Sequence, residues 1–168
     1  EIYNPRTGTW SLTGNLNRPR FLGTAILLPD GRVLAAGNST PFTQNPPTDP
    51  RREGTSEIFD PATGTWSQLV EMQGPSDAGI GSVLLTSGRV LATGGDWLGR
   101  NGPDFPAQMY DPATHTWQLV APCKSFGLWE HLFLLGDGSV LKLGSSPILR
   151  FFETPPTPSA TPTETATP

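Results

Sequence analysis

The chain has 168 residues, of which 19 are Gly and 19 are Pro, whereas Asp, Glu, Lys and Arg together make only 15%. This composition excludes a helical bundle or coiled coil, and the net charge of −4 argues against a surface for nucleic acid or anionic membranes. The hydrophobic content of 35% is too high for a disordered chain, and no aliphatic run is long enough to span a bilayer. We therefore expect a soluble, turn-rich β protein, in which the single cysteine, Cys123, forms no internal disulfide bond.

One repeated element ends in tryptophan. Its three copies are Glu1–Trp10, Glu57–Trp66 and Gln108–Trp117, at a period of about 50 residues. In the second copy Asp60 can cap a tight turn through its carboxylate, and Gly64 suits a left-handed exit residue. His115 replaces this glycine in the third copy, and we interpret it as a turn variant rather than a ligand, because His enters the left-handed region at modest cost. We expect structural roles in this element for Trp10, Trp66, Trp117, Asp60 and Asp111.

A second repeated element follows each tryptophan at a nearly constant distance. Its copies are Leu27–Leu34, Leu84–Leu91 and Leu134–Leu141. Short apolar runs flank Asp30-Gly31 in the first copy and Asp137-Gly138 in the third, which predicts hairpins closed by type I′ turns. The turn glycines Gly31, Gly88 and Gly138 are therefore expected to be structural. Two hairpins in each repeat give a four-stranded antiparallel sheet, which has the size of a propeller blade.

The repeat resembles the kelch repeat in several motifs. These are the glycines after the second strand (Gly94-Gly95, reduced to Gly37-Asn38 and Gly144-Ser145), the run Glu57–Pro61, and Trp66 six residues after Asp60. The kelch arginine before the first strand is matched at Arg20, whereas Asp77 and Gly127 stand at the equivalent places. The resemblance covers residues 1–153 and implies an all-β propeller fragment of about three blades, an incomplete ring. We expect blade parts at 1–12, 24–69, 80–119 and 131–153.

Residues 154–168 are mostly Thr and Pro, which predicts an extended linker or tail without a packed core. Such segments resemble the linkers and stalks of secreted modular proteins, so we expect an extracellular or cell-surface location; a merely disordered terminus is the alternative. The last blade would lack its fourth strand. We expect sequence upstream of Glu1 to supply this strand and the missing blades, and the alternative is that two copies assemble into one ring.

Propeller geometry separates two kinds of loop. The tight turns leave one face, whereas residues 38–56 and 96–107, with the connections around 18–22, 71–79 and 121–129, leave the other. Long loops on a rigid scaffold are where binding residues collect. The candidate binding residues on this long-loop face are Phe42, Arg51, Arg52, Trp97, Arg100, Asp104, Phe105 and Trp129. Trp97 and Trp129 lie outside the repeated tryptophan position, so they could stack on a sugar or anchor a protein partner, although burial beneath the loop is nearly as plausible.

Catalytic patterns are weak in this sequence. The resemblance extends to galactose oxidase, whose relatives use a copper site with Tyr, His and a Cys-linked Tyr. Tyr3 and Tyr110 occupy the repeat position of Phe59, so only Cys123 and His131 remain as conceivable metal ligands, and both have simpler structural interpretations. No cofactor is implied, and no nucleic acid or membrane insertion. We predict a non-catalytic binding or scaffold module for a protein or glycan ligand; the alternative is the propeller portion of a galactose-oxidase-like copper-radical oxidase whose catalytic residues lie outside this chain.

Overall fold

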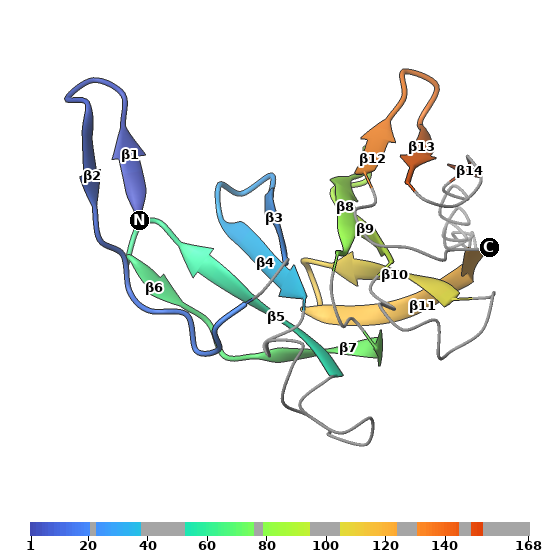
Figure 1. Cartoon of the computed structure of the whole chain (residues 1–168), viewed down its shortest axis with the longest axis horizontal. Coiled ribbons are helices and arrows are strands. Elements are labelled where there is room, and N and C mark those ends of the chain that lie inside the picture. The colour runs from blue at the N-terminus through green and yellow to red at the C-terminus, as the bar shows by residue number, and fades with distance from the viewer. Residues whose placement is uncertain are drawn as a thin grey trace, which may run out of the picture.

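The computed structural model describes residues 1–20, 23–37, 53–75, 79–94, 105–123, 131–144 and 149–152. Every regular element within these residues is a β-strand, and the strands form four antiparallel sheets. Figure 1 shows the sheets one after another in chain order, as an open arc with β1–β2 at one end and β12–β14 at the other. The predicted all-β class and the incomplete set of propeller blades are confirmed.

Each sheet takes its strands from one continuous stretch of the chain. The first hairpin consists of β1 (Ile2–Asn4) and β2 (Thr9–Ser11). The second blade consists of β3 (Thr24–Leu27), β4 (Val33–Gly37), β5 (Glu53–Asp60), β6 (Thr65–Trp66) and β7 (Val70–Pro75). The third blade consists of β8 (Gly81–Leu84), β9 (Val90–Thr93), β10 (Phe105–Asp111) and β11 (Thr116–Cys123). The fourth blade consists of β12 (His131–Leu134), β13 (Ser139–Leu143) and β14 (Leu149–Phe152).

The turns at Gly31 and Gly138 are not the type I′ turns that the sequence predicted. In the first of them the Gly31 N–H donates to Leu28 O at 3.0 Å, the Leu28 N–H donates to Arg32 O, and Gly31 has φ of +86°. His115 is the only non-glycine residue with positive φ in the described part of the chain, so Asp30 does not take the left-handed conformation that a type I′ turn demands. A three-residue loop, a type I turn followed by a left-handed glycine, forms instead. Gly88 and Gly138 make the same pair of backbone hydrogen bonds, with Thr86 and Gly136 where the first turn has Pro29, so the loop does not depend on the proline.

The fourth-blade turn offers a matched test of this geometry. Gly136 and Gly138 both have room for a Cβ atom, but only Gly138 has a positive φ, +81°. Gly138→Ala should lower the free energy of unfolding by about 1–2 kcal/mol through backbone strain alone, whereas Gly136→Ala should leave it unchanged or raise it by up to about 1 kcal/mol. Urea unfolding of the two variants measures this difference, and equal stabilities would contradict the assignment.

The turns before each repeated tryptophan form as predicted. The Gly64 N–H donates to Asp60 O at 2.8 Å, and the Asp60 carboxylate accepts the Ala62 N–H, also at 2.8 Å. His115 has φ of +56° in the position of Gly64, which confirms the interpretation as a turn variant. Its ring nitrogen Nδ1 lies 3.1 Å from the Tyr110 hydroxyl, a side-chain hydrogen bond that glycine could not make.

The fourth strand of the second blade is interrupted, which adds a strand to those expected. The Ser67 hydroxyl accepts the Ile58 N–H at 2.9 Å, while Ser67 O accepts the Asn17 side-chain amide at 2.7 Å. Because this carbonyl is taken out of the ladder, β6 ends at Trp66, and β7 resumes pairing with β5 at Val70. Strands therefore continue past the expected ends at residues 69 and 119, to Pro75 and Cys123, and parts of the predicted long loops belong to β5, β7, β10 and β11.

The main cores lie between the sheets. One cluster joins the second and third blades, with Leu28, Leu34, Ala36, Ile58 and Met72 from one side and Ile80, Val90, Ala92, Tyr110 and Trp117 from the other. A second joins the third and fourth blades, with Leu85, Leu91, Ala107, Met109 and Val140. The first strands β3, β8 and β12 contact one another in sequence. This face-to-face packing of neighbouring sheets fixes the positions of their strand ends, from which the loops leave, relative to one another.

Candidate binding face at the long-loop end of the blades

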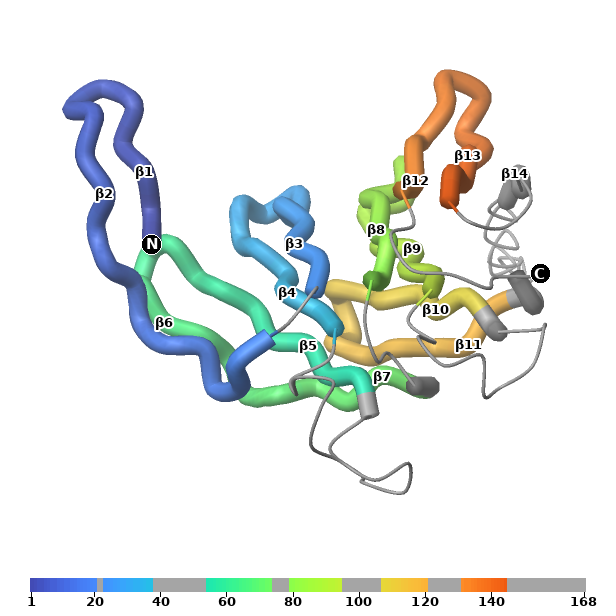
Figure 2. The backbone as a smooth tube through the Cα atoms, in the orientation of Figure 1, coloured from blue at the N-terminus to red at the C-terminus, as the bar shows by residue number. Residues whose placement is uncertain are grey.

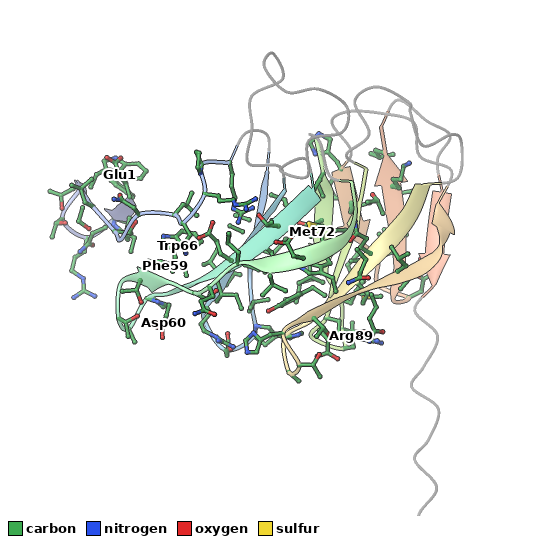
Figure 3. All side chains as sticks on the ribbon, turned by 90° about the horizontal axis from the view of Figure 1, so that it is seen from below. Glu1, Phe59, Asp60, Trp66, Met72 and Arg89 are labelled. Atoms are coloured by element: carbon green, nitrogen blue, oxygen red, sulfur yellow. The ribbon has the colours of Figure 1, made fainter. Side chains whose placement is uncertain are left out.

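The connections between the second and third strands, and between consecutive blades, leave the same end of the sheets. In the second blade β4 ends at Gly37 and β5 begins at Glu53; in the third, β9 ends at Thr93 and β10 begins at Phe105. Figure 3 shows Asp60 and Arg89, each at or beside a tight turn, together on the opposite side of the molecule. The long-loop face is therefore defined by strand ends that the blade cores hold in place.

Arg20 ties the two ends of the longest connection together. Its guanidinium Nη1 donates to Gly37 O at 2.8 Å and to Thr55 O at 2.6 Å. Gly37 precedes the connection of residues 38–52, and Thr55 lies just after it. The Arg20 side chain thus braces Gly37 and Thr55, which already pair across β4 and β5, at the base of the segment that carries Phe42, Arg51 and Arg52.

The charge of Arg20 is balanced by Glu57 inside the sheet. Nη2 of Arg20 lies 2.7 Å from Glu57 Oε1, and the exposed fractions of the two side chains are 6% and 0%. The second carboxylate oxygen accepts the backbone N–H and side-chain amide of Asn17, at 2.8 and 2.9 Å. Burial lowers the pKa of Arg20 from its usual value, an effect that the hydrogen bond and the charge of Glu57 oppose. Every oxygen of the buried carboxylate is satisfied, as a buried charge requires.

The contact between Asn17 and Glu57 recurs in the next blade. Asn17 and Gln73 each follow a repeated tryptophan by seven residues, and each donates its backbone N–H at 2.8 Å, to Glu57 and to Gln108 respectively. The acceptor is the side chain that opens the repeated element, buried on the third strand of the following blade. We call this contact the linker latch. It attaches the segment that follows a repeated tryptophan to the third strand of the next blade.

The tight-turn face carries weaker electrostatic contacts. Asp30 and Arg32 form an ion pair at 2.7 Å with side chains 47% and 31% exposed. Hydrogen bonds from Arg32 lower the pKa of Asp30, and the Asp30 carboxylate raises that of Arg32. Burial raises the pKa of the Tyr110 phenol above its usual value. Each of these groups has its partner within five residues along the chain, so their contacts stabilise the turns.

The predicted binding residues fall outside what the structure places. Phe42, Arg51, Arg52, Trp97, Arg100, Asp104 and Trp129 lie outside the described residues, and Phe105 is described only as the first residue of β10. Sequence reasoning noted Arg20 as the kelch arginine but did not assign its partner or its role at the loop base. Glu57 could have indicated this ion pair, because it is an acidic residue in a segment whose pattern predicts a buried strand. The two residues are 37 positions apart, so spacing alone could not pair them.

Neither a metal site nor a membrane-spanning helix is found among the described residues. No group of three or more His, Cys, Asp and Glu there could hold a metal ion. His131 is exposed at the start of β12, and Tyr110 packs on Trp117 and bonds His115. The donors in this part of the chain therefore do not fit a copper site. Within the same residues there is no helix of the length and apolarity that a membrane span requires.

Comparisons with known proteins agree with this architecture. No protein-family model matches the chain. A protein of Arabidopsis thaliana described as an F-box/kelch-repeat protein is 29% identical over 133 residues, which are 79% of this chain and 32% of that protein. A solved structure of a fungal alcohol oxidase of the AA5 family, in complex with copper, matches with a TM-score of 0.56 and 14% identity, over 76% of this chain and 26% of the other. The chain consists of kelch-like β-propeller blades, and it spans about a third of the length of the curated relative that it matches.

Proposed function

We propose that the protein is a kelch-repeat binding module that takes a protein ligand on its long-loop face. The observation that carries this proposal is the hydrogen bonding of Arg20 to both Gly37 O and Thr55 O, which fixes the base of the loop bearing Phe42, Arg51 and Arg52. A loop whose base is held in place loses less conformational entropy when it binds a ligand. More of the interaction energy of its contacts then appears as affinity. Its kelch-repeat relative supports a binding role.

The proposal is tested on arrays of peptides and of glycans probed with the labelled chain. Trp97→Ala and Trp129→Ala should each weaken binding to a captured peptide by roughly 30-fold, the loss typical of a buried aromatic anchor. Arg89→Ala, on the tight-turn side, should leave it unchanged and serves as the matched control. Binding to glycans alone would replace the protein ligand by a carbohydrate. Binding that both tryptophan variants retain would contradict the assignment to this face.

Two further parts of the proposal rest on other observations. The Thr/Pro composition of residues 154–168 supports a tether in a secreted or surface-attached protein. The fold likeness to the fungal alcohol oxidase supports a second candidate, a propeller portion of a copper-radical oxidase with its ligands outside this chain. Copper uptake with a radical absorption band in a longer form of the protein would favour this candidate over the binding module.

A further inference from the structure

The outermost strand of the third blade, β11, is an open sheet edge. It runs for eight residues, and within the described part of the chain it pairs with β10 alone. Figure 1 shows it on the outer side of the arc, beyond β10. The third blade packs against a neighbour on each side, so this edge does not lie at an end of the arc. The unpaired N–H and C=O groups of such an edge can pair with another strand.

The repeat shows which backbone groups of β11 face outward. In the second blade the N–H of Ser67, the residue after the repeated tryptophan, donates inward to Ile58 O at 2.8 Å. Gln118 is the equivalent residue of β11. Because the direction of hydrogen bonding alternates along an antiparallel strand, the N–H and C=O groups of Trp117 and Leu119 face away from β10. They are the groups that a further strand would meet.

The equivalent strand of the second blade is covered by the chain that precedes the blade. Figure 2 shows the segment after β2 running along β6. There the Gly14 N–H donates to Gly64 O at 2.8 Å, and the Asn17 side-chain amide donates to Ser67 O at 2.7 Å. Val70 is the residue equivalent to Gly14 in the next repeat, and it pairs with β5 of its own blade. This segment is thus part of β7 in the next repeat, which leaves the edge of β11 open.

The composition of β11 suits pairing with a second copy of the same strand. No Asp, Glu, Lys or Arg lies between Asp111 and Lys124, so two such strands bring no like charges together. On β7, by contrast, the exposed Glu71 places a charge on the outer strand, a common protection against edge pairing. Leu119 is 51% exposed although β7 packs against β11, so it offers apolar surface beside the open edge.

We propose that two copies of the chain associate by antiparallel pairing of β11 with the β11 of the partner. A two-fold axis at Gln118 places this residue opposite its own copy, where each side-chain amide offers a donor and an acceptor to the other. It places Leu119 opposite the partner's Trp117, so the outward-facing N–H and C=O groups of both residues are paired. The two blades then form one continuous sheet through a closed, isologous interface. This inference does not depend on the ligand proposed for the long-loop face.

The Thr/Pro-rich segment of the same chain fits this edge poorly. Prolines recur through residues 154–168, and proline has no N–H to donate to a neighbouring strand. A strand of another protein would need no two-fold symmetry, so a cross-link at the axis distinguishes it from a second copy.

Sedimentation of the 168-residue chain over a range of concentrations tests the association. The original chain should dimerise, and Leu119→Lys should weaken the dimer by roughly 10-fold or more, because it brings two like charges together across the axis. Leu12→Lys is the matched control, since it makes the same change at a leucine that is 85% exposed in the segment after β2. It should leave the dimer unchanged, and circular dichroism checks that both variants fold.

Disulfide formation tests the register of the two strands. On a Cys123→Ser background, Gln118→Cys should cross-link two copies on mild oxidation, because residues at the axis form a close pair without hydrogen bonds between them. Thr116→Cys, on the same strand, is the matched control. It should not cross-link, since the proposed register places Thr116 opposite the partner's Val120.

Three results would overturn the proposal. The first is a chain that sediments as a monomer at every concentration. The second is a dimer that Leu12→Lys dissociates and Leu119→Lys does not, which would move the interface from the third blade to the end of the arc. The third is a Gln118→Cys variant that cross-links to an extended, cysteine-bearing peptide of unrelated sequence more readily than to itself. The edge would then take a strand of another protein.

Discussion

Glu57→Ala is expected to lower the free energy of unfolding by about 3–5 kcal/mol, because it leaves the Arg20 guanidinium buried without its counter-charge. The variant also removes the acceptor for the backbone and side-chain N–H groups of Asn17. Urea unfolding followed by circular dichroism measures the change. Asp30→Ala is the matched control: it breaks the exposed ion pair with Arg32 and should cost less than about 1 kcal/mol.

A double variant separates the charge from the packing at this site. Replacing both Arg20 and Glu57 by apolar residues of similar size, Arg20→Met with Glu57→Leu, removes the isolated charge and should recover a large part of the stability lost in Glu57→Ala. The backbone carbonyls of Gly37 and Thr55 would still lose their donor, so amide exchange near them should remain faster than in the original chain. A Glu57→Ala variant as stable as the original would contradict the buried ion pair.

Trp117→Ala is expected to lower the free energy of unfolding by about 3–5 kcal/mol, since it empties a fully packed site between the second and third blades. It also removes the indole N–H that the buried Ser56 hydroxyl accepts as a hydrogen bond. Trp10→Ala removes the same side chain from the same repeat position, but Trp10 is 65% exposed, so its loss should cost less than about 1 kcal/mol. Equal effects of the two substitutions would show that the repeat position, rather than the contact between blades, sets the energy.

The repeated elements could be predicted because their determinants are local. Asp60, Pro61 and Gly64 specify a turn within five residues, and the tryptophan opposite Phe59 follows from the register of that turn. Local rules failed at the Asp-Gly turns. Asp30-Gly31 indicates a type I′ turn in a two-residue loop, but Leu28 and Arg32 close a three-residue loop in which the glycine alone is left-handed.

The contacts that position the candidate binding face could not be predicted from spacing. Arg20 and Glu57 are 37 residues apart, and Asn17 reaches Ser67 O across 50. Such contacts exist only once the segment before β3 lies across the second blade. The hydrogen bond from Asn17 to Ser67 O ends β6 at Trp66, and β7 then continues the blade to Pro75, so the blade does not end near residue 69 as predicted.

The linker latch has an evolutionary consequence. Its donor is a main-chain N–H, at Asn17 and at Gln73, so it demands nothing of the side chain at that position except that it not be proline. The acceptor is a side-chain oxygen and needs Glu or Gln, as at Glu57 and Gln108. The segments that join duplicated blades can therefore diverge in sequence while every blade keeps the same mode of attachment. Such a fold could then gain or lose whole blades.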